Sequence, residues 1–180
     1  MALTLVSACL LGLCTRMDGE ARRFETVAAL GRACTLVPVC PEQLGGLPTP
    51  RPSAEIQGGT GEDVLAGRVR IETEAGSDVT GAFVRGAEQV LEVARIVGAT
   101  GAVLKARSPS CGVHQTYDGT FSGRLREGSG VCAALLLREG LSLFTEEARW
   151  GGRSGAGKVN SAEMRPCTHD GTGMVGEDLL

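Results

Sequence analysis

The feature that most constrains the fold is the segment 78–98, DVTGAFVRGAEQVLEVARIVG. Its apolar residues recur at helical spacing, which predicts one long amphipathic helix, capped by Ser77 or Asp78 and ended by Gly98. An apolar run at 102–106 follows directly and predicts a buried strand. A long helix that leads straight into a buried strand is typical of a β-α-β unit, whose strands pair in parallel.

Other segments extend this pattern. Strands are predicted at 3–8, 34–39 and 141–145, and helices at 21–33 and at 131–139, the second capped by Ser129. Pro38 lacks a backbone N–H, so the strand at 34–39 is expected to be short or to lie at an edge of the sheet. The order of elements predicts an α/β fold: a single Rossmann-like domain with a mainly parallel β-sheet flanked by helices.

Long segments rich in Gly and Pro separate these elements. The segment 41–77 is predicted to be irregular apart from a short strand at 69–72, and 107–130 is turn-rich. These long loops are expected at the carboxyl ends of the strands, where loops in a compact domain commonly carry function. We assign residues 1–148 to the domain and 149–180 to a Gly/Ser-rich C-terminal tail that is expected to be flexible.

Composition narrows the possible partners. The 180 residues suffice for one domain with a normal core, and the net charge of −3 with 3% aromatic residues gives no reason to expect nucleic-acid binding. No apolar run is long enough for a membrane span, and no basic leader precedes the apolar start of the chain. We therefore expect a cytoplasmic protein with a small-molecule partner and no membrane contact. The oligomeric state is not indicated.

The chain has seven cysteines, an odd number that argues against a disulfide framework. Cys9, Cys40 and Cys111 each lie near the end of a predicted strand, so a parallel sheet would bring them to one edge. Sulfur ligands favour zinc, copper(I) or an iron–sulfur cluster. No CxxC pair is present, so reactive or merely buried thiols remain an equal alternative, and Cys34 and Cys132 are expected to pack as small apolar residues.

Several motifs are longer and stricter than these general patterns. VSACLLG, RMDG, PVCPEQLGGLPTPRP, GSDVT, LKARSPSCG, YDGTFSG and GVCAALL occur in this order between residue 3 and about residue 145. In this respect the chain resembles the DUF523 family, whose characterised members are TudS-like thiouracil desulfidases. The resemblance implies a [4Fe-4S] cluster held by three cysteines, with one iron left open for the sulfur of the substrate. By motif, the ligands would be Cys9, Cys40 and Cys111, with Cys14 as an alternative to Cys9.

The resemblance also implies catalytic roles. It points to Glu42 and to a serine of SPSC, either Ser108 or Ser110, of which we favour Ser108. Glu42 is expected to act as an acid or base near the reacting carbon, and Lys105 is expected to stabilise negative charge on the substrate. Each residue also has a structural interpretation: Glu42 as a helix-start carboxylate, and the two serines as turn residues.

The resemblance predicts a [4Fe-4S]-dependent desulfidase that removes sulfur from a thiolated pyrimidine, nucleobase or nucleoside similar to 4-thiouracil. Two alternatives remain open: a non-catalytic iron–sulfur or zinc-binding module, and a zinc-thiolate hydrolase. Arg51 and Arg107 are expected to be surface charges, although either could hold an anionic group of a substrate. The segment 152–159, GRSGAGKV, resembles a phosphate-binding loop but ends in Val159, so it lacks the hydroxyl that binds Mg²⁺.

Overall fold

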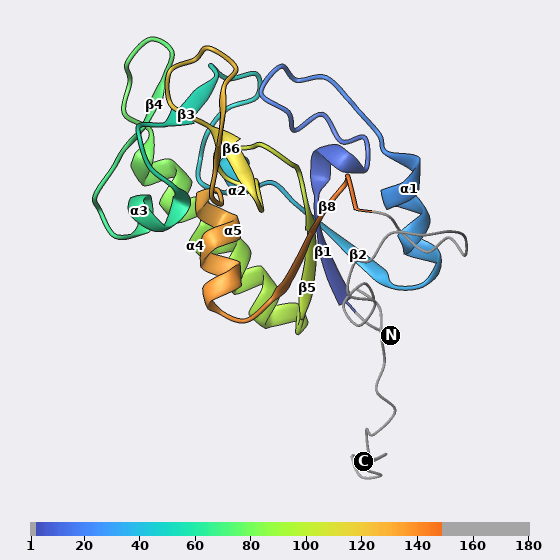
Figure 1. The fold of residues 1–180 in the computed structure, drawn as a ribbon. Helices are drawn as coiled ribbons and strands as arrows, with labels where there is room; N and C mark the ends of the chain where they lie inside the picture. The colour runs from blue at the N-terminus through green and yellow to red at the C-terminus, as the bar shows by residue number, and fades with distance from the viewer. Residues whose placement is uncertain (1–2, 149–180) are drawn as a thin grey trace, which may run out of the picture.

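The computed structural model describes residues 3–148, and it confirms the predicted α/β architecture (Figure 1). A four-stranded sheet has the order β2-β1-β5-β8, and all three strand pairings are parallel. Its strands are β1 (Leu3–Ser7), β2 (Thr35–Val39), β5 (Gly101–Leu104) and β8 (Ser142–Thr145). β2 lies at an edge, as expected for a strand that contains Pro38.

Alternating side chains on the strands build two apolar cores, one on each face of the sheet. Leu5 of β1 belongs to the larger core, which also contains Phe83 and Leu136. Its neighbour Val6 belongs to the smaller core with Val27. The same alternation runs along β5 and β8, because successive side chains of a strand point to opposite faces. A strand that is buried on both faces explains the continuous apolar runs in the sequence.

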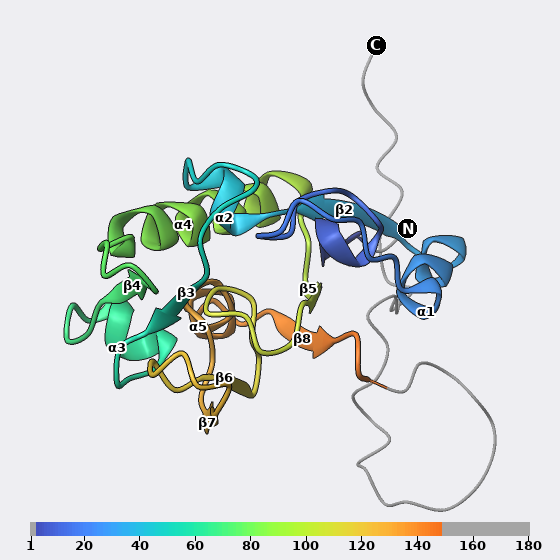
Figure 2. The same ribbon diagram turned by 90° about the horizontal axis from the view of Figure 1, so that it is seen from above.

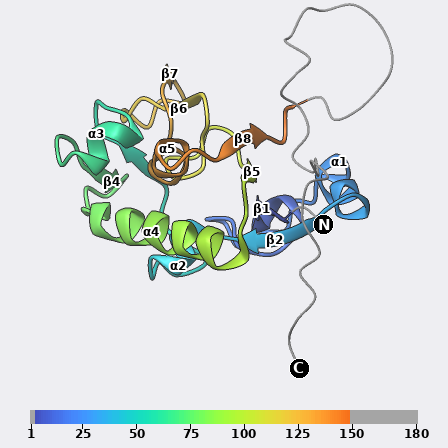
Figure 3. The ribbon, with the colours of Figure 1, turned by 90° about the horizontal axis from the view of Figure 1, so that it is seen from below.

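Helices cover both faces of the sheet. α4 (Thr80–Val97) and α5 (Val131–Arg138) pack against each other on one face, whereas α1 (Glu25–Ala28) lies on the other (Figures 2 and 3). After β1 the chain continues to β2 at one edge of the sheet, whereas after β5 it continues to β8 at the opposite edge. Such a reversal between adjacent strands opens a crevice beyond their carboxyl ends, where ligands of α/β proteins commonly bind.

The helix predicted at 21–33 is much shorter in the structure. It consists of α1 and a 3-10 turn, η2 (Ala29–Arg32). Its apolar side chains Phe24, Val27 and Leu30 pack into the smaller core and are spaced by three residues. A spacing of three matches the 3-10 period rather than the α period of 3.6, which explains the difference.

The segments predicted to be irregular contain short elements that the sequence analysis missed. They are the helices α2 (Pro41–Leu44) and α3 (Gly61–Leu65) and two antiparallel strand pairs, β3 (Ala54–Ile56) with β4 (Ile71–Thr73), and β6 (Gln115–Tyr117) with β7 (Leu125–Glu127). The strand expected at 69–72 is thus β4, shifted along the chain. Strands of three residues are too short to show a recognisable alternation.

The ends of α4 only partly match the prediction. Gly98 ends the helix in the left-handed conformation, with φ of 67°, as expected. At the other end, the capping position is Val79, and no side chain caps the helix there. Asp78 instead accepts a hydrogen bond from the backbone N–H of Thr80 at 2.9 Å, so it stabilises the turn that enters the helix.

Two glycines allow α2 to lie directly against α4. A Cβ atom at Gly45 would stand 2.0 Å from the carbonyl oxygen of Ala82, and one at Gly86 would stand 1.9 Å from that of Pro41. Only residues without a side chain permit such an approach. The contact fixes the position of α2, which matters because Cys40 and Glu42 lie at the start of this helix.

We expect Gly86→Ala to destabilise the protein by about 1–3 kcal/mol or more, since the added methyl group must push α2 away from α4. Gly81→Ala is the matched control in the same helix. Its Cβ would meet only the flexible end of Arg85 at 3.4 Å, so its better helix propensity should leave stability equal or up to about 1 kcal/mol higher. Urea unfolding of both variants measures the effect. Equal stabilities of the two variants would contradict the proposed role of the contact.

Candidate functional site

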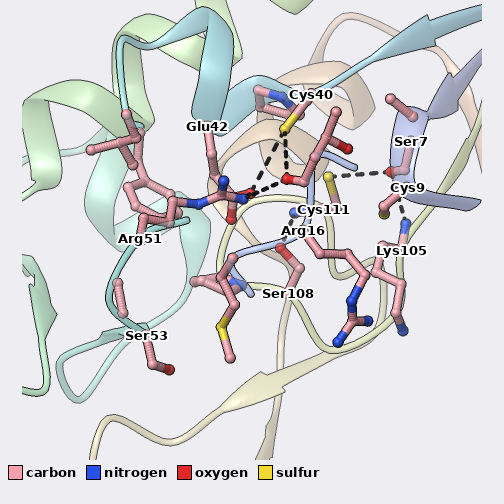
Figure 4. Close-up of a pocket in the computed structure, with 18 of the residues that line it drawn as sticks. Ser7, Cys9, Arg16, Cys40, Glu42, Arg51, Ser53, Lys105, Ser108 and Cys111 are labelled. Atoms are coloured by element: carbon pink, nitrogen blue, oxygen red, sulfur yellow. Dashed lines mark hydrogen bonds and ion pairs between the residues drawn. The ribbon is translucent and has the colours of Figure 1, made fainter. Parts of the chain in front are cut away.

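A cavity of about 400 Å³ lies at the carboxyl ends of β1, β2 and β5 (Figure 4). Its wall includes residues that directly follow each of these strands, together with the loop around Thr15 and the proline-rich segment around Arg51. This is the crevice that the reversal of the chain between β1 and β5 creates. Its volume lies within the usual range for a small-molecule site.

The three cysteines singled out from the sequence all line this cavity. Cys9 lies in the 3-10 turn η1 (Ala8–Leu10) directly after β1, and Cys40 follows β2 at the start of α2. Cys111 lies in the loop between β5 and β6. Figure 4 shows their sulfur atoms gathered in one part of the cavity. The strands β2, β1 and β5 are neighbours in the sheet, which explains why residues so distant in sequence meet here.

The surroundings of these cysteines favour the protonated thiol. Burial raises the pKa of the Cys9 thiol to about 11, and the nearby Cys40 and Glu42 act in the same direction. Burial also raises the pKa of Cys40, and it holds the pKa of Cys111 well above its usual value. The thiolates are therefore unfavourable without a positive partner, and a metal that binds them must release their protons.

The other cysteines of the described chain lie elsewhere. Cys14 is exposed and does not line the cavity, so its position does not favour it over Cys9 as a ligand. Cys132 is fully buried in α5 within the larger core, as expected for a small apolar residue. Cys34 is also buried, but it is disulfide-bonded, so the expectation that it packs only as a small apolar residue was wrong. Cys167 and His169 lie outside residues 3–148, as does the loop-like segment 152–159.

The donor set suits a cluster better than a single ion. Within residues 3–148, no three His, Cys, Asp or Glu side chains converge closely enough to hold one metal ion. A zinc ion bound by three thiolates at about 2.3 Å would need its ligands in tight convergence. The ligands of an iron–sulfur cluster bind separate iron atoms, so they stand further apart, and thiolate is the usual ligand. Three thiols around one cavity fit that requirement.

Glu42 lies in the first turn of α2, next to the helix start, and also faces the cavity. Its carboxylate forms an ion pair with Arg51, and its Oε2 lies 4.0 Å from the sulfur of Cys40. Burial raises the pKa of Glu42, while the positive charge of Arg51 opposes this shift. The Glu42 side chain thus lies at the start of a helix and also faces the cavity.

Arg51 is not the surface charge that the sequence analysis expected. Its side chain is only 6% exposed. Besides Glu42, the guanidinium donates to the carbonyl of Thr15 at 3.1 Å and to the hydroxyl of Thr49 at 3.2 Å. Arg51 therefore ties the loop that follows β1 to the proline-rich loop that follows α2, and it holds the Glu42 carboxylate between them. Arg107 does match the surface expectation, since it pairs with Glu147 and is 45% exposed.

The two serines of SPSC have different environments. Ser108 lines the cavity, and its hydroxyl oxygen accepts hydrogen bonds from the backbone N–H groups of Ser110 and Cys111, both at 3.1 Å. Ser110 is fully buried and does not line the cavity. Its carbonyl instead accepts the N–H groups of Cys132 and Ala133 at the start of α5. This backbone contact replaces the expected Ser129 cap, which was wrong because Gly130 occupies the capping position.

Lys105 lines the cavity and forms an ion pair with Glu146. The Glu146 side chain, directly after β8, is 3% exposed, and its second oxygen accepts the backbone N–H of Ala106 at 2.8 Å. Glu146 thus holds the side chain of Lys105 in place where it lines the cavity. Glu146 was missed in the sequence, where it is one of two adjacent glutamates after the last strand with no distinguishing pattern.

Fold and site together define the class of protein: a parallel-sheet α/β domain with a thiol-lined cavity at the point where the chain reverses direction. The sequence profile of the 2-thiouracil desulfurase family matches residues 4–148. The chain belongs to this family, which confirms the resemblance seen in its motifs.

Two relatives illustrate the similarity. The uncharacterized protein YbbK of Bacillus subtilis (strain 168) is 46% identical over 142 residues, which cover 79% of this chain and 94% of YbbK. A solved structure of the [4Fe-4S]-dependent thiouracil desulfidase TudS, of the DUF523 group, is 42% identical and superposes with a TM-score of 0.72. That comparison covers 82% of this chain and 92% of the TudS chain.

Two expectations concern matters beyond the described site. Within residues 3–148, no helix combines the length and apolar character that crossing a membrane requires. The cytoplasmic location stays a prediction. The division of the chain into a domain at 1–148 and a flexible tail also stays a prediction, because 149–180 lie outside the described residues.

Proposed function

We propose that this chain is a [4Fe-4S]-dependent thiouracil desulfidase that replaces the sulfur of a thiolated pyrimidine by oxygen. The observation that carries the proposal is the convergence of Cys9, Cys40 and Cys111 on one cavity. Membership of the 2-thiouracil desulfurase family and the similarity to TudS support it. Cys9, Cys40 and Cys111 would hold the cluster. When bound, it would supply an open iron that acts as a Lewis acid toward the soft thiocarbonyl sulfur.

The proposed reaction is a hydrolysis that needs no electron donor. Water adds to the thiocarbonyl carbon, the C=S bond is replaced by a C=O bond, and the sulfur leaves as sulfide. Carbon and sulfur keep their oxidation states, and the two protons of water are released to the surroundings or to the sulfide. The protein must therefore position the water and the ring and move protons between them.

Glu42 is the proposed acid/base group. Its carboxylate faces the cavity beside Cys40, and the ion pair with Arg51 fixes its direction. From there it can take a proton from the attacking water and return it later to a ring nitrogen or to the leaving sulfur. Arg51 acts as a positioning residue, because its guanidinium is engaged by Glu42 and Thr15 rather than free for a substrate.

Ser108 and Lys105 are the proposed polar contacts of the substrate. The Ser108 oxygen already accepts two backbone N–H groups, so its own proton is left to be donated into the cavity. Lys105 also lines this space, and its ammonium, held by Glu146 and the carbonyl of Ala106, would stabilise negative charge that develops on the ring or its oxygen. Ser110 is buried away from the cavity, so we infer a structural role for its backbone at the start of α5.

The test is anaerobic purification and reconstitution with iron and sulfide, followed by incubation with 4-thiouracil. We expect a broad visible charge-transfer band, loss of the thiouracil absorbance, and release of one sulfide per uracil formed. Zinc-loaded protein is the control and should be inactive. A cluster without turnover would favour the non-catalytic module, and activity with zinc but not with iron would favour the zinc-thiolate hydrolase. Either result would contradict the proposal.

A further inference from the structure

Ser7, the last residue of β1, makes a contact that the proposed reaction does not use. It is 2% exposed, and its hydroxyl lies between two groups from the chain that follows β5. The hydroxyl oxygen accepts a hydrogen bond from the backbone N–H of Lys105 at 3.0 Å. It stands 3.4 Å from the sulfur of Cys111, to which it donates (Figure 4).

Strand geometry explains why Ser7 occupies this position. β1 and β5 pair in parallel as far as Val6 and Val103, and beyond these residues their backbones separate toward the cavity. The backbone N–H of Lys105 no longer finds a strand partner there, and it donates its hydrogen bond to the hydroxyl of Ser7 instead. The Ser7 side chain thereby connects the ends of the two strands. The end of the strand pairing and the cysteine loop are therefore linked through one side chain.

The direction of the hydroxyl proton follows from this arrangement. A serine hydroxyl has a single proton to donate, and here the Lys105 N–H occupies one of its acceptor positions. The proton is left to point at Cys111. Among residues 3–148, Ser7 has the one hydroxyl that donates to the sulfur of Cys9, Cys40 or Cys111. A bond of this kind becomes stronger when the acceptor is a thiolate.

We propose that Ser7 is a positioning residue of the cluster site: its hydroxyl donates to the Cys111 thiolate, orients it, and draws charge away from the sulfur. This inference rests on the proposed function for the identity of the bound group. Hydrogen bonds to cluster sulfurs raise the reduction potential, and partners of ligands contribute to the affinity of a metal site. By drawing charge from one of its ligands, the bond would lower the negative charge of the cluster as a whole.

The experiment compares Ser7→Thr with Ser7→Val in the reconstituted full-length chain. The two side chains have the same shape, but only threonine keeps the hydroxyl. Both variants add the same methyl group at this cavity-lining position, so its effect cancels in the comparison. We expect Ser7→Val to shift the cluster's reduction potential to a more negative value and to release iron to a chelator about 10-fold faster. Ser7→Thr should stay close to the wild type in both measurements.

Ser53→Ala provides a second control, because Ser53 lines the same cavity without donating to a cysteine sulfur. The reduction potential of the cluster in Ser53→Ala should equal that of the wild type. Equal potentials and iron-release rates for Ser7→Thr and Ser7→Val would overturn the inference, even if both variants unfold more easily than the wild type. Failure of the wild-type chain to assemble any cluster would instead overturn the proposed function, so the two failures are distinguishable.

Discussion

Replacing Cys9, Cys40 or Cys111 singly with alanine is expected to abolish both the visible absorption of the reconstituted protein and its desulfidase activity. Each of the three thiols lines the cavity from a different strand end, and no other cysteine among residues 3–148 faces it. The proposed cluster would already have one iron without a protein ligand, so it should not tolerate the loss of a second ligand. Iron content, the visible spectrum and thiouracil turnover, all under anaerobic conditions, measure the effect.

Cys14→Ala is the matched control for these substitutions. Cys14 is exposed and does not line the cavity, so the variant should keep the wild-type iron content and activity. The comparison also decides between Cys9 and Cys14, which the motifs alone left open. Loss of the cluster in Cys14→Ala together with its retention in Cys9→Ala would show that the proposed ligand set is wrong.

Glu42→Gln should retain the cluster and lower kcat by about 10²–10⁴-fold, the usual contribution of a positioned acid or base. Glutamine has nearly the same shape and can still accept a hydrogen bond from Arg51, so the loop contacts should survive. It cannot take up the proton of the attacking water. Steady-state kinetics of the reconstituted variant, at matched iron content, separates this effect from a loss of cluster.

Glu62→Gln is the matched control. Glu62 occupies the same place in α3 that Glu42 occupies in α2, the second residue of the helix, but it is exposed and does not line the cavity. Both substitutions remove a negative charge that interacts favourably with a helix start. Activity of Glu62→Gln should remain within about 2-fold of the wild type. Similar kcat values for the two variants would remove Glu42 from the mechanism.

Patterns within short stretches of the chain were sufficient to predict the central fold. The apolar stripe of α4 and the buried run of β5 correctly predicted a parallel sheet. Because the carboxyl ends of parallel strands share one edge, the same reasoning placed Cys9, Cys40 and Cys111 together. Prediction failed where elements are short, as in α2, α3 and the three-residue strands, since one helical turn or three residues show no reliable period.

The partners of the site residues could not be predicted in this way. Arg51 lies 9 residues from Glu42, Lys105 lies 41 from Glu146, and Ser7 lies 104 from Cys111. Each resembles an ordinary surface or strand-end residue until its partner is known. The sequence motifs were also unable to distinguish Ser108 from Ser110, whereas the backbone turn directs only Ser108 to the cavity.

Residue type and local periodicity thus decided which thiols, carboxylates and hydroxyls this protein has available and at which end of the sheet they lie. The tertiary structure alone decided which of them face one another, which charge is neutralised by which partner, and which serine reaches the cavity. The physical reason is that hydrogen bonds and ion pairs depend on distances of a few ångströms. Such distances arise only when strands, glycine contacts and loops far apart in the chain have packed together.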